Sequence, residues 1–183
     1  QMQLQNFDNA IALFRSAIDL EPDDISLNFY LVEALYTNGN FGQALEVIEQ
    51  NMPHLAMQDN RDQAWMINDY AIVLDSLGRH TDAIEQVNKA IEHDPDDKVF
   101  QRNHGRFLFN AGELEESATI FGRLLATDQG DIRSHFEMAR IYLKQGHKKA
   151  AQESFAKAEG VQAFIVSQFD ADMYEDVKHE LMT

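Results

Sequence analysis

Four glycines are spaced along the chain in a way that restricts what it can fold into. Gly78, Gly112 and Gly146 are 34 residues apart, and Gly39 precedes Gly78 by 39 residues. A small residue follows each glycine by five positions, at Ala44, Ala83, Ser117 and Ala151. A 34-residue period is typical of arrays in which each unit is a pair of helices. One pair cannot bury its apolar face alone, so the spacing predicts units stacked into a solenoid.

A second set of small or slender residues lies seven positions before each glycine. The set is Val32, Ala71, Gly105 and Ala139. We expect these residues where the two helices of a unit approach most closely, because close approach demands a short side chain. An apolar residue also lies nine positions after each glycine, which is four positions after the small residue that follows the glycine. These apolar residues are Ile48, Val87, Phe121 and Phe155. That spacing places them on one face of a helix and predicts that they are buried.

The residues Ala71, Gly78, Ala83, Ala90 and Pro95 resemble the tetratricopeptide repeat pattern, and the resemblance recurs through most of the chain. It implies an all-α fold, a right-handed solenoid of antiparallel helix pairs with a C-terminal capping helix.

We place a single domain over residues 1–183, divided into repeats by the same pattern. Its parts are a partial repeat at 1–24, repeats at 25–63, 64–97, 98–131 and 132–165, and a capping helix at 166–183. The first full repeat is longer by about five residues, and we expect these as a loop between Met52 and Asp62. The start within a repeat suggests a piece of a longer protein.

The net charge of −16 argues against polyanionic partners. Lys and Arg number 15 against 31 Asp and Glu, so the summed field repels nucleic acid and anionic membrane surfaces. No stretch approaches the roughly 18 apolar residues of a membrane span, so we expect a soluble protein without membrane insertion. The absence of Cys excludes disulfides and thiolate metal sites. The absence of Cys does not distinguish a cytoplasmic from a periplasmic protein, and of the two compartments we expect the cytoplasm.

The sequence lacks the motifs of catalytic and metal sites. None of the seven His residues belongs to a His-Glu-x-x-His motif, and His104 and His135 fall at core positions of the repeat. Asp170, Asp172 and Asp176 lack the glycine and the spacing of a calcium loop. A glycine-rich phosphate loop and a nucleophile motif are also absent. We therefore predict no catalysis, no bound metal and no cofactor.

In the tetratricopeptide repeat family, the first helix of each unit lines the concave wall of the solenoid. The resemblance assigns an aromatic and mildly acidic half of this wall to Phe29, Tyr36, Trp65 and Asn68. It assigns a basic half to Arg102, Asn103, Arg106, Asn110, Arg133, Arg140 and Lys144. Arg presents a planar fork of donors that matches a carboxylate, and Asn donates to a peptide backbone without adding charge. We expect the basic half to bind an acidic segment or a terminal carboxylate of a protein partner.

Two alternatives for the arginines stay open at this point. They can pair with the abundant Asp and Glu of neighbouring helices, as solvated surface ion pairs. One subgroup of the family binds the C-terminal carboxylate of chaperones through a clamp of Lys, Asn and Arg. That clamp is matched only in part, because Arg106 stands where Asn is usual and Glu137 where a cation is expected.

These observations predict a noncatalytic interaction module that holds a peptide or an extended partner segment, in an adaptor or assembly-factor role. The first alternative is a self-associating scaffold. Its homodimer would form through the N-terminal partial repeat, whose apolar residues are Phe7, Ala10, Ile11, Phe14 and Ile18. The second alternative is a domain that positions a substrate for a larger enzyme.

Overall fold

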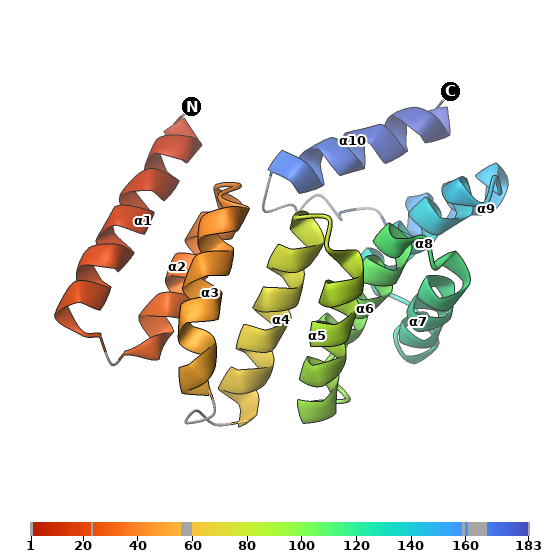
Figure 1. The fold of residues 1–183 in the computed structure, drawn as a ribbon. Helices are drawn as coiled ribbons and strands as arrows, with labels where there is room; N and C mark the ends of the chain where they lie inside the picture. Colours follow the sequence, from red (N-terminus) through yellow and green to blue (C-terminus); the bar gives the residue numbers. More distant parts are fainter. Residues whose placement is uncertain (1, 23, 56–59, 159, 161–167, 183) are drawn as a thin grey trace. The chain divides into compact units, whose positions relative to one another are not determined.

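The computed structural model describes residues 2–22, 24–55, 60–158, 160 and 168–182. Within these ranges the chain forms ten α-helices and no β-strand (Figure 1). The chain divides into two compact units, residues 1–96 and 97–183, which we call unit 1 and unit 2. The predicted all-α fold is confirmed, while the repeat boundaries and the single domain stay predictions.

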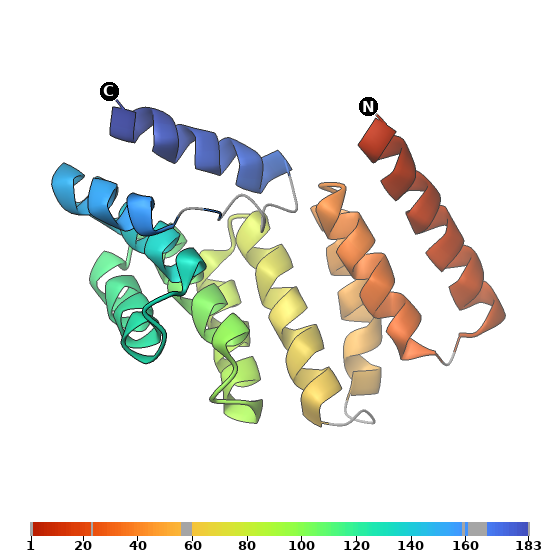
Figure 2. The same cartoon turned by 180° about the vertical axis from the view of Figure 1, so that it is seen from behind.

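Unit 1 contains five helices, and each packs on the next along the chain. They are α1 (Met2–Leu20), α2 (Ile25–Thr37), α3 (Phe41–Leu55), α4 (Asn60–Ser76) and α5 (His80–His93). Unit 2 contains the other five, seen from behind in Figure 2. They are α6 (Lys98–Ala111), α7 (Leu114–Thr127), α8 (Ile132–Lys144), α9 (Lys148–Lys157) and α10 (Gln168–Met182).

The spaced glycines form the turns inside the helix pairs, as predicted. Gly39, Gly78, Gly112 and Gly146 have φ of 77°, 77°, 91° and 76°. This left-handed conformation ends a helix at little cost for glycine only. At Gly112 the amide donates to the Phe109 carbonyl at 3.0 Å, and the amide of Glu113 donates to the Leu108 carbonyl at 2.9 Å. The chain therefore reverses within a few residues and starts the next helix antiparallel to the last.

The predicted close approach of paired helices is confirmed, most clearly at Gly105. A Cβ atom at this residue would lie 2.7 Å from Cε2 of Phe121, a ring with 0% of its surface exposed. The Ser117 hydroxyl donates to the Gly105 carbonyl at 2.7 Å in the same contact. The corresponding residues Val32, Ala71 and Ala139 are also buried.

The extra residues of the first full repeat are partly helical, whereas the sequence predicted a loop. Residues 52–55 end α3, with Pro53 inside the helix, and residues 60–62 begin α4. Residues 56–59 lie outside the described ones. The prediction was wrong for the helical residues because segments without glycine can extend the helices that flank them.

The C-terminal helix packs on the last pair through an aromatic contact. Tyr174 stacks on Phe136 of α8 at 6.0 Å between ring centroids and on Phe155 of α9 at 5.7 Å. Val177 and Leu181 are buried in the same cluster. Tyr174 was not among the residues predicted to pack here. The structure of residues 161–167, which include part of the predicted last repeat and capping helix, lies outside the described residues.

The apolar face of α1 is covered by unit 1 more fully than predicted. Ile11 is buried, and Phe14 and Ile18 pack against the core of unit 1. Phe14 also stacks on Tyr30 at 5.7 Å between ring centroids. Among the side chains of α1 that the structure describes, the large apolar ones that are exposed are instead Leu13 and Leu20, at 70% and 82%.

Candidate functional site

The four residues predicted for the aromatic half differ in accessibility. Phe29 and Tyr36 of α2 are half-buried and pack against the core of unit 1. Trp65 of α4 is also half-buried, and Asn68 is 1% exposed. The core therefore covers much of the surface predicted for a ligand, and the exposed parts of the three aromatic side chains are what a partner can contact.

Asp69, next to Asn68, has an unusual protonation equilibrium. Burial and, to a lesser extent, the nearby carboxylate of Glu33 raise the pKa of Asp69 to about 7, although the hydrogen bond with Asn68 acts in the opposite direction. Asp69 therefore keeps its proton to a much higher pH than an ordinary Asp. Glu33 is exposed on α2, which packs on α4. This part of unit 1 carries less negative charge than its sequence suggests.

In unit 2, Arg102 of α6 is held by Asp131, the acidic residue just before α8. Its Nη1 donates to Oδ2 of Asp131 at 3.2 Å, and the two side chains are 19% and 9% exposed. Asp131 also caps α8 and accepts a hydrogen bond from the Ser134 hydroxyl at 2.8 Å. Burial raises the pKa of Asp131, but Ser134 and the Arg102 guanidinium more than offset this, so the pKa lies below its usual value. Burial and the charge of Arg102 lower the pKa of Arg133, which remains a cation.

Arg140 of α8 is also paired within its unit. Its Nη1 donates to Oε2 of Glu137 at 2.6 Å, with the side chains 10% and 13% exposed. Its Cζ lies 4.2 Å from the ring centroid of Phe109, close enough for a cation–π interaction. The alternative of arginine–carboxylate pairing is thus realised for Arg102 and Arg140. Both pairs are largely shielded from solvent rather than solvated.

Arg106 differs from the two paired arginines. Its Nε atom is buried and has no hydrogen-bond partner among the described residues. Its Cζ lies 5.4 Å from the ring centroid of Phe107. Asn103 and Asn110, the predicted backbone donors of the same helix, are half-buried. Unit 2 therefore contains one buried guanidinium donor that lacks an acceptor in this part of the chain.

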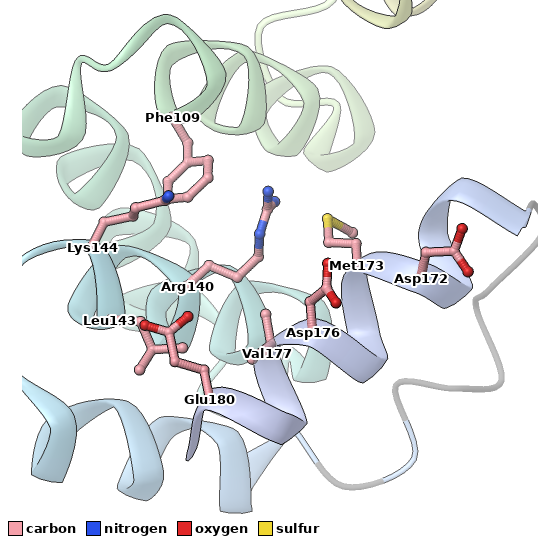
Figure 3. Close-up of a pocket in the computed structure, with 9 residues that line it drawn as sticks. All are labelled: Phe109, Arg140, Leu143, Lys144, Asp172, Met173, Asp176, Val177 and Glu180. Carbon is pink, nitrogen blue, oxygen red and sulfur yellow. The ribbon is translucent and has the colours of Figure 1, made fainter. Parts of the chain in front are cut away.

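A cavity of about 390 Å³ lies between α6, α8 and α10 in unit 2 (Figure 3). Its lining consists of Phe109, Arg140, Leu143, Lys144, Asp172, Met173, Asp176, Val177 and Glu180. In Figure 3, Arg140 extends from α8 toward the space between Phe109 and Met173. Of the predicted site residues, the cavity brings together Arg140 and Lys144.

The contribution of α10 to this cavity was missed from the sequence, although a signal was present. Asp172, Asp176 and Glu180 are four residues apart, and Met173 and Val177 follow the first two. Residues four apart lie on one face of a helix. The spacing alone does not show which face of the helix packs against the preceding pair, so it could not bring these acids near Arg140.

The described residues offer no evident metal site: no group of three or more His, Asp and Glu there could hold an ion. His104 is half-buried, and burial together with Arg123 lowers its pKa. His135 is 9% exposed, with Nε2 at 3.0 Å from the Gln129 carbonyl. Both side chains are packed, as their repeat positions predicted.

None of the helices in the described ranges is long and apolar enough to cross a membrane.

Three family models described as tetratricopeptide repeat match this chain, at residues 1–53, 70–132 and 132–163. The chain belongs to the tetratricopeptide repeat family. This tetratricopeptide repeat chain is 22% identical over 120 residues to tetratricopeptide repeat protein 16 of Homo sapiens and, to the same extent, of Macaca fascicularis. The match covers 66% of this chain and 14% of each relative, so the chain spans about one seventh of their length.

Solved structures with a similar fold include three tetratricopeptide repeat proteins. YrrB, described as having an unusual peptide-binding site, is 20% identical with a TM-score of 0.60, covering 88% of this chain and 81% of YrrB. The repeats of a putative kinesin light chain of Podosopora anserina are 17% identical with a TM-score of 0.70. The match covers 87% of this chain and 90% of that protein. MamA is 18% identical with a TM-score of 0.65, and the match covers 88% of this chain and 93% of MamA. These similarities confirm the fold class, a solenoid of helix pairs.

Proposed function

We propose that this tetratricopeptide repeat chain is a noncatalytic adaptor or assembly factor that binds an extended partner segment along α6 and α8 of unit 2. The cations of these two helices support the proposal, because they gather on first helices of repeats in a chain of net charge −16. The exposed parts of Phe29, Tyr36 and Trp65 are a separate candidate surface in unit 1. An acidic or carboxylate-terminated partner segment is the chemistry that the arginines favour.

The observation that carries the proposal is the buried Nε atom of Arg106, which lacks an acceptor among the described residues. A buried donor without a partner costs about 1–3 kcal/mol. A carboxylate or backbone carbonyl of a bound segment would remove that cost once the side chains that cover Nε move aside. Arg102 and Arg140 support binding less directly, because Asp131 and Glu137 already neutralise them.

An array of random peptides of about ten residues tests the proposal, followed by affinity measurements on the best acidic binders by fluorescence anisotropy. Arg106→Met keeps the length of the side chain and removes its donors. We expect it to weaken binding by roughly tenfold, because a hydrogen bond to a charged group contributes about 1.5–3 kcal/mol. Arg123→Met is the matched control, since Arg123 is exposed on α7, the second helix of the pair.

Equal affinity of the Arg106→Met and Arg123→Met variants would contradict the role of Arg106. Replacing Arg102 or Arg140 is a poorer test. Either change leaves a largely buried carboxylate without its cation, which destabilises the fold as well as any binding site. Circular dichroism confirms in each case that the helices are retained.

Self-association through α1 is the second candidate function. Leu13 and Leu20 are 70% and 82% exposed and are seven residues apart, so they lie on one face of the helix. Sedimentation at several concentrations tests it with the double variant Leu13→Gln/Leu20→Gln. Leu77→Gln is the control, because Leu77 is exposed in the turn before α5. A dimer lost only in the double variant supports the candidate, and a monomer at every concentration excludes it.

A further inference from the structure

The C-terminal helix α10 covers part of the surface proposed for the partner. Tyr174 of α10 stacks on Phe136 of α8 at 6.0 Å between ring centroids, and Phe136 is only 5% exposed. Phe136, Arg140 and Lys144 follow one another at intervals of four residues, so they lie on one face of α8. Arg140 and Lys144 of this face are residues that the repeat pattern assigns to the concave wall. The helix expected as a cap therefore also packs over the wall.

α10 brings its own carboxylates to the cations of this wall. The cavity of unit 2 is lined by Arg140 and Lys144 of α8 and by Asp172, Asp176 and Glu180 of α10 (Figure 3). Asp172 and Glu180 have interactions of their own, and Arg140 is paired with Glu137. An acidic segment that approaches Arg140 or Lys144 here meets groups of the same charge, and such juxtaposition is unfavourable. While α10 is docked, both its volume and its charge therefore oppose an acidic ligand.

The contact of α10 with the helix pairs is incomplete. Among the described side chains of α10, those that are buried are Tyr174, Val177 and Leu181, which form a single stripe. On the side of Phe109 and Leu143, about 390 Å³ stays unfilled. Side chains that line an unfilled space lack the contacts that close packing provides. A segment that fits between these two residues makes contacts that α10 does not make.

We propose that α10 is an autoinhibitory element: it occupies the α8 end of the partner-binding surface, and it leaves when an acidic partner segment binds there. The inference rests on the proposed function and adds a means of regulation to the same site. Docking of α10 and binding of the segment at Arg140 and Lys144 exclude each other. The apparent affinity is therefore lower than the affinity of the open surface, by the fraction of molecules in which α10 is released.

Hydrogen exchange measured by mass spectrometry on the unmodified chain tests this inference directly. The probes are the acidic peptides of about ten residues that bind best in the array. We expect a saturating peptide to slow amide exchange in α8, which it covers, and to speed exchange in α10, which it displaces. Slower exchange in α8 with unchanged or slower exchange in α10 overturns the inference, while peptide binding itself stands.

Tyr174→Ala provides a second test, because it removes the ring that stacks on Phe136 and Phe155. We expect this variant to bind the acidic peptides at least roughly threefold more tightly in fluorescence anisotropy, since more molecules have α10 released. Met182→Ala is the matched control. It also shortens a large uncharged side chain of α10, but one that is 76% exposed.

The possible results separate this inference from the proposed function. Equal peptide affinity of Tyr174→Ala and Met182→Ala overturns the inference alone. If circular dichroism shows that Tyr174→Ala loses its helices, the exchange experiment decides, because it needs no variant. Peptides that bind Tyr174→Ala but not the unmodified chain support the inference. Binding of no peptide to either protein contradicts the proposed function and the inference together.

Discussion

Replacing Gly105 by Ala tests the helix contact on which the third full repeat depends. In an ordinary helix this change is stabilising by about 0.5–1 kcal/mol, because Ala has less conformational freedom to lose. At Gly105, however, the new Cβ would lie 2.7 Å from Cε2 and 2.8 Å from Cζ of Phe121. Optimal separation between carbon atoms is about 3.5–4.0 Å, so the ring or the helix must move.

The size of the effect follows from these opposing contributions. Phe121 is 0% exposed, so its ring has no solvent-filled space to move into. Overpacking of this kind costs about 1–3 kcal/mol. After subtraction of the gain in helix propensity, we expect Gly105→Ala to lower the free energy of unfolding by about 1 kcal/mol.

Urea denaturation followed by circular dichroism measures this difference, with Gly122→Ala as the matched control. Gly122 lies on α7 beside Phe121, is exposed, and has no atom within 4 Å of an added Cβ. It should gain about 0.5–1 kcal/mol. The two Gly→Ala variants therefore move the urea midpoint in opposite directions.

Adding Phe121→Leu to Gly105→Ala removes part of the ring that the new methyl group meets. The double variant should lose less stability than the sum of the single variants, because the two residues are in contact. If Gly105→Ala is as stable as Gly122→Ala, the argument from close approach is wrong.

Three further variants test local features of the fold. Gly112→Ala places a β-carbon at φ 91° and should lower the free energy of unfolding by about 1 kcal/mol, measured by thermal denaturation. Asp69 holds its proton more tightly in the folded protein, so its contribution to stability is lost as the pH rises from the usual pKa range of Asp through about 7. Asp69→Asn should therefore raise the free energy of unfolding at pH 8 by on the order of 1 kcal/mol and change it little at pH 4. Asp131→Ala removes the cap of α8 and should cost about 1–2 kcal/mol at pH 7. Because folding lowers the pKa of Asp131, the cost of Asp131→Ala should shrink as the pH falls below the usual pKa range of Asp. An unchanged cost at low pH would contradict this reasoning.

Periodicity was sufficient to predict the helix pairs, because turns and close contacts demand particular residues. A left-handed turn requires glycine, as at Gly78, and a close helix contact requires a small side chain, as at Ala71. Both are properties of one residue and its local backbone, so they recur at a fixed spacing. The extended helices around residues 52–62 were not predicted, since no such repeated signal marks them.

The candidate site was predicted less completely because it depends on contacts between distant residues. Arg102 meets Asp131, which is 29 residues away in the chain. Asp176 lines the same cavity as Arg140, and Tyr174 is one of the residues that pack α10 on the preceding pair. The residue types are evident from the sequence. Local spacing, however, does not show which acid pairs with Arg102 or which helices α10 packs against.

The contact between Gly105 and Phe121 means that the repeats are not interchangeable parts. Other repeats have Ala71 or Ala139 where Gly105 stands, and Val87 or Phe155 where Phe121 stands. Transplanting a first helix with Ala into the third full repeat would bring a methyl group against the Phe121 ring. The last repeat combines Ala139 with Phe155, whose ring is half-buried rather than enclosed like that of Phe121. A helix transplanted into the third full repeat must therefore match the packing around Phe121, which the residue types of the other repeats do not specify.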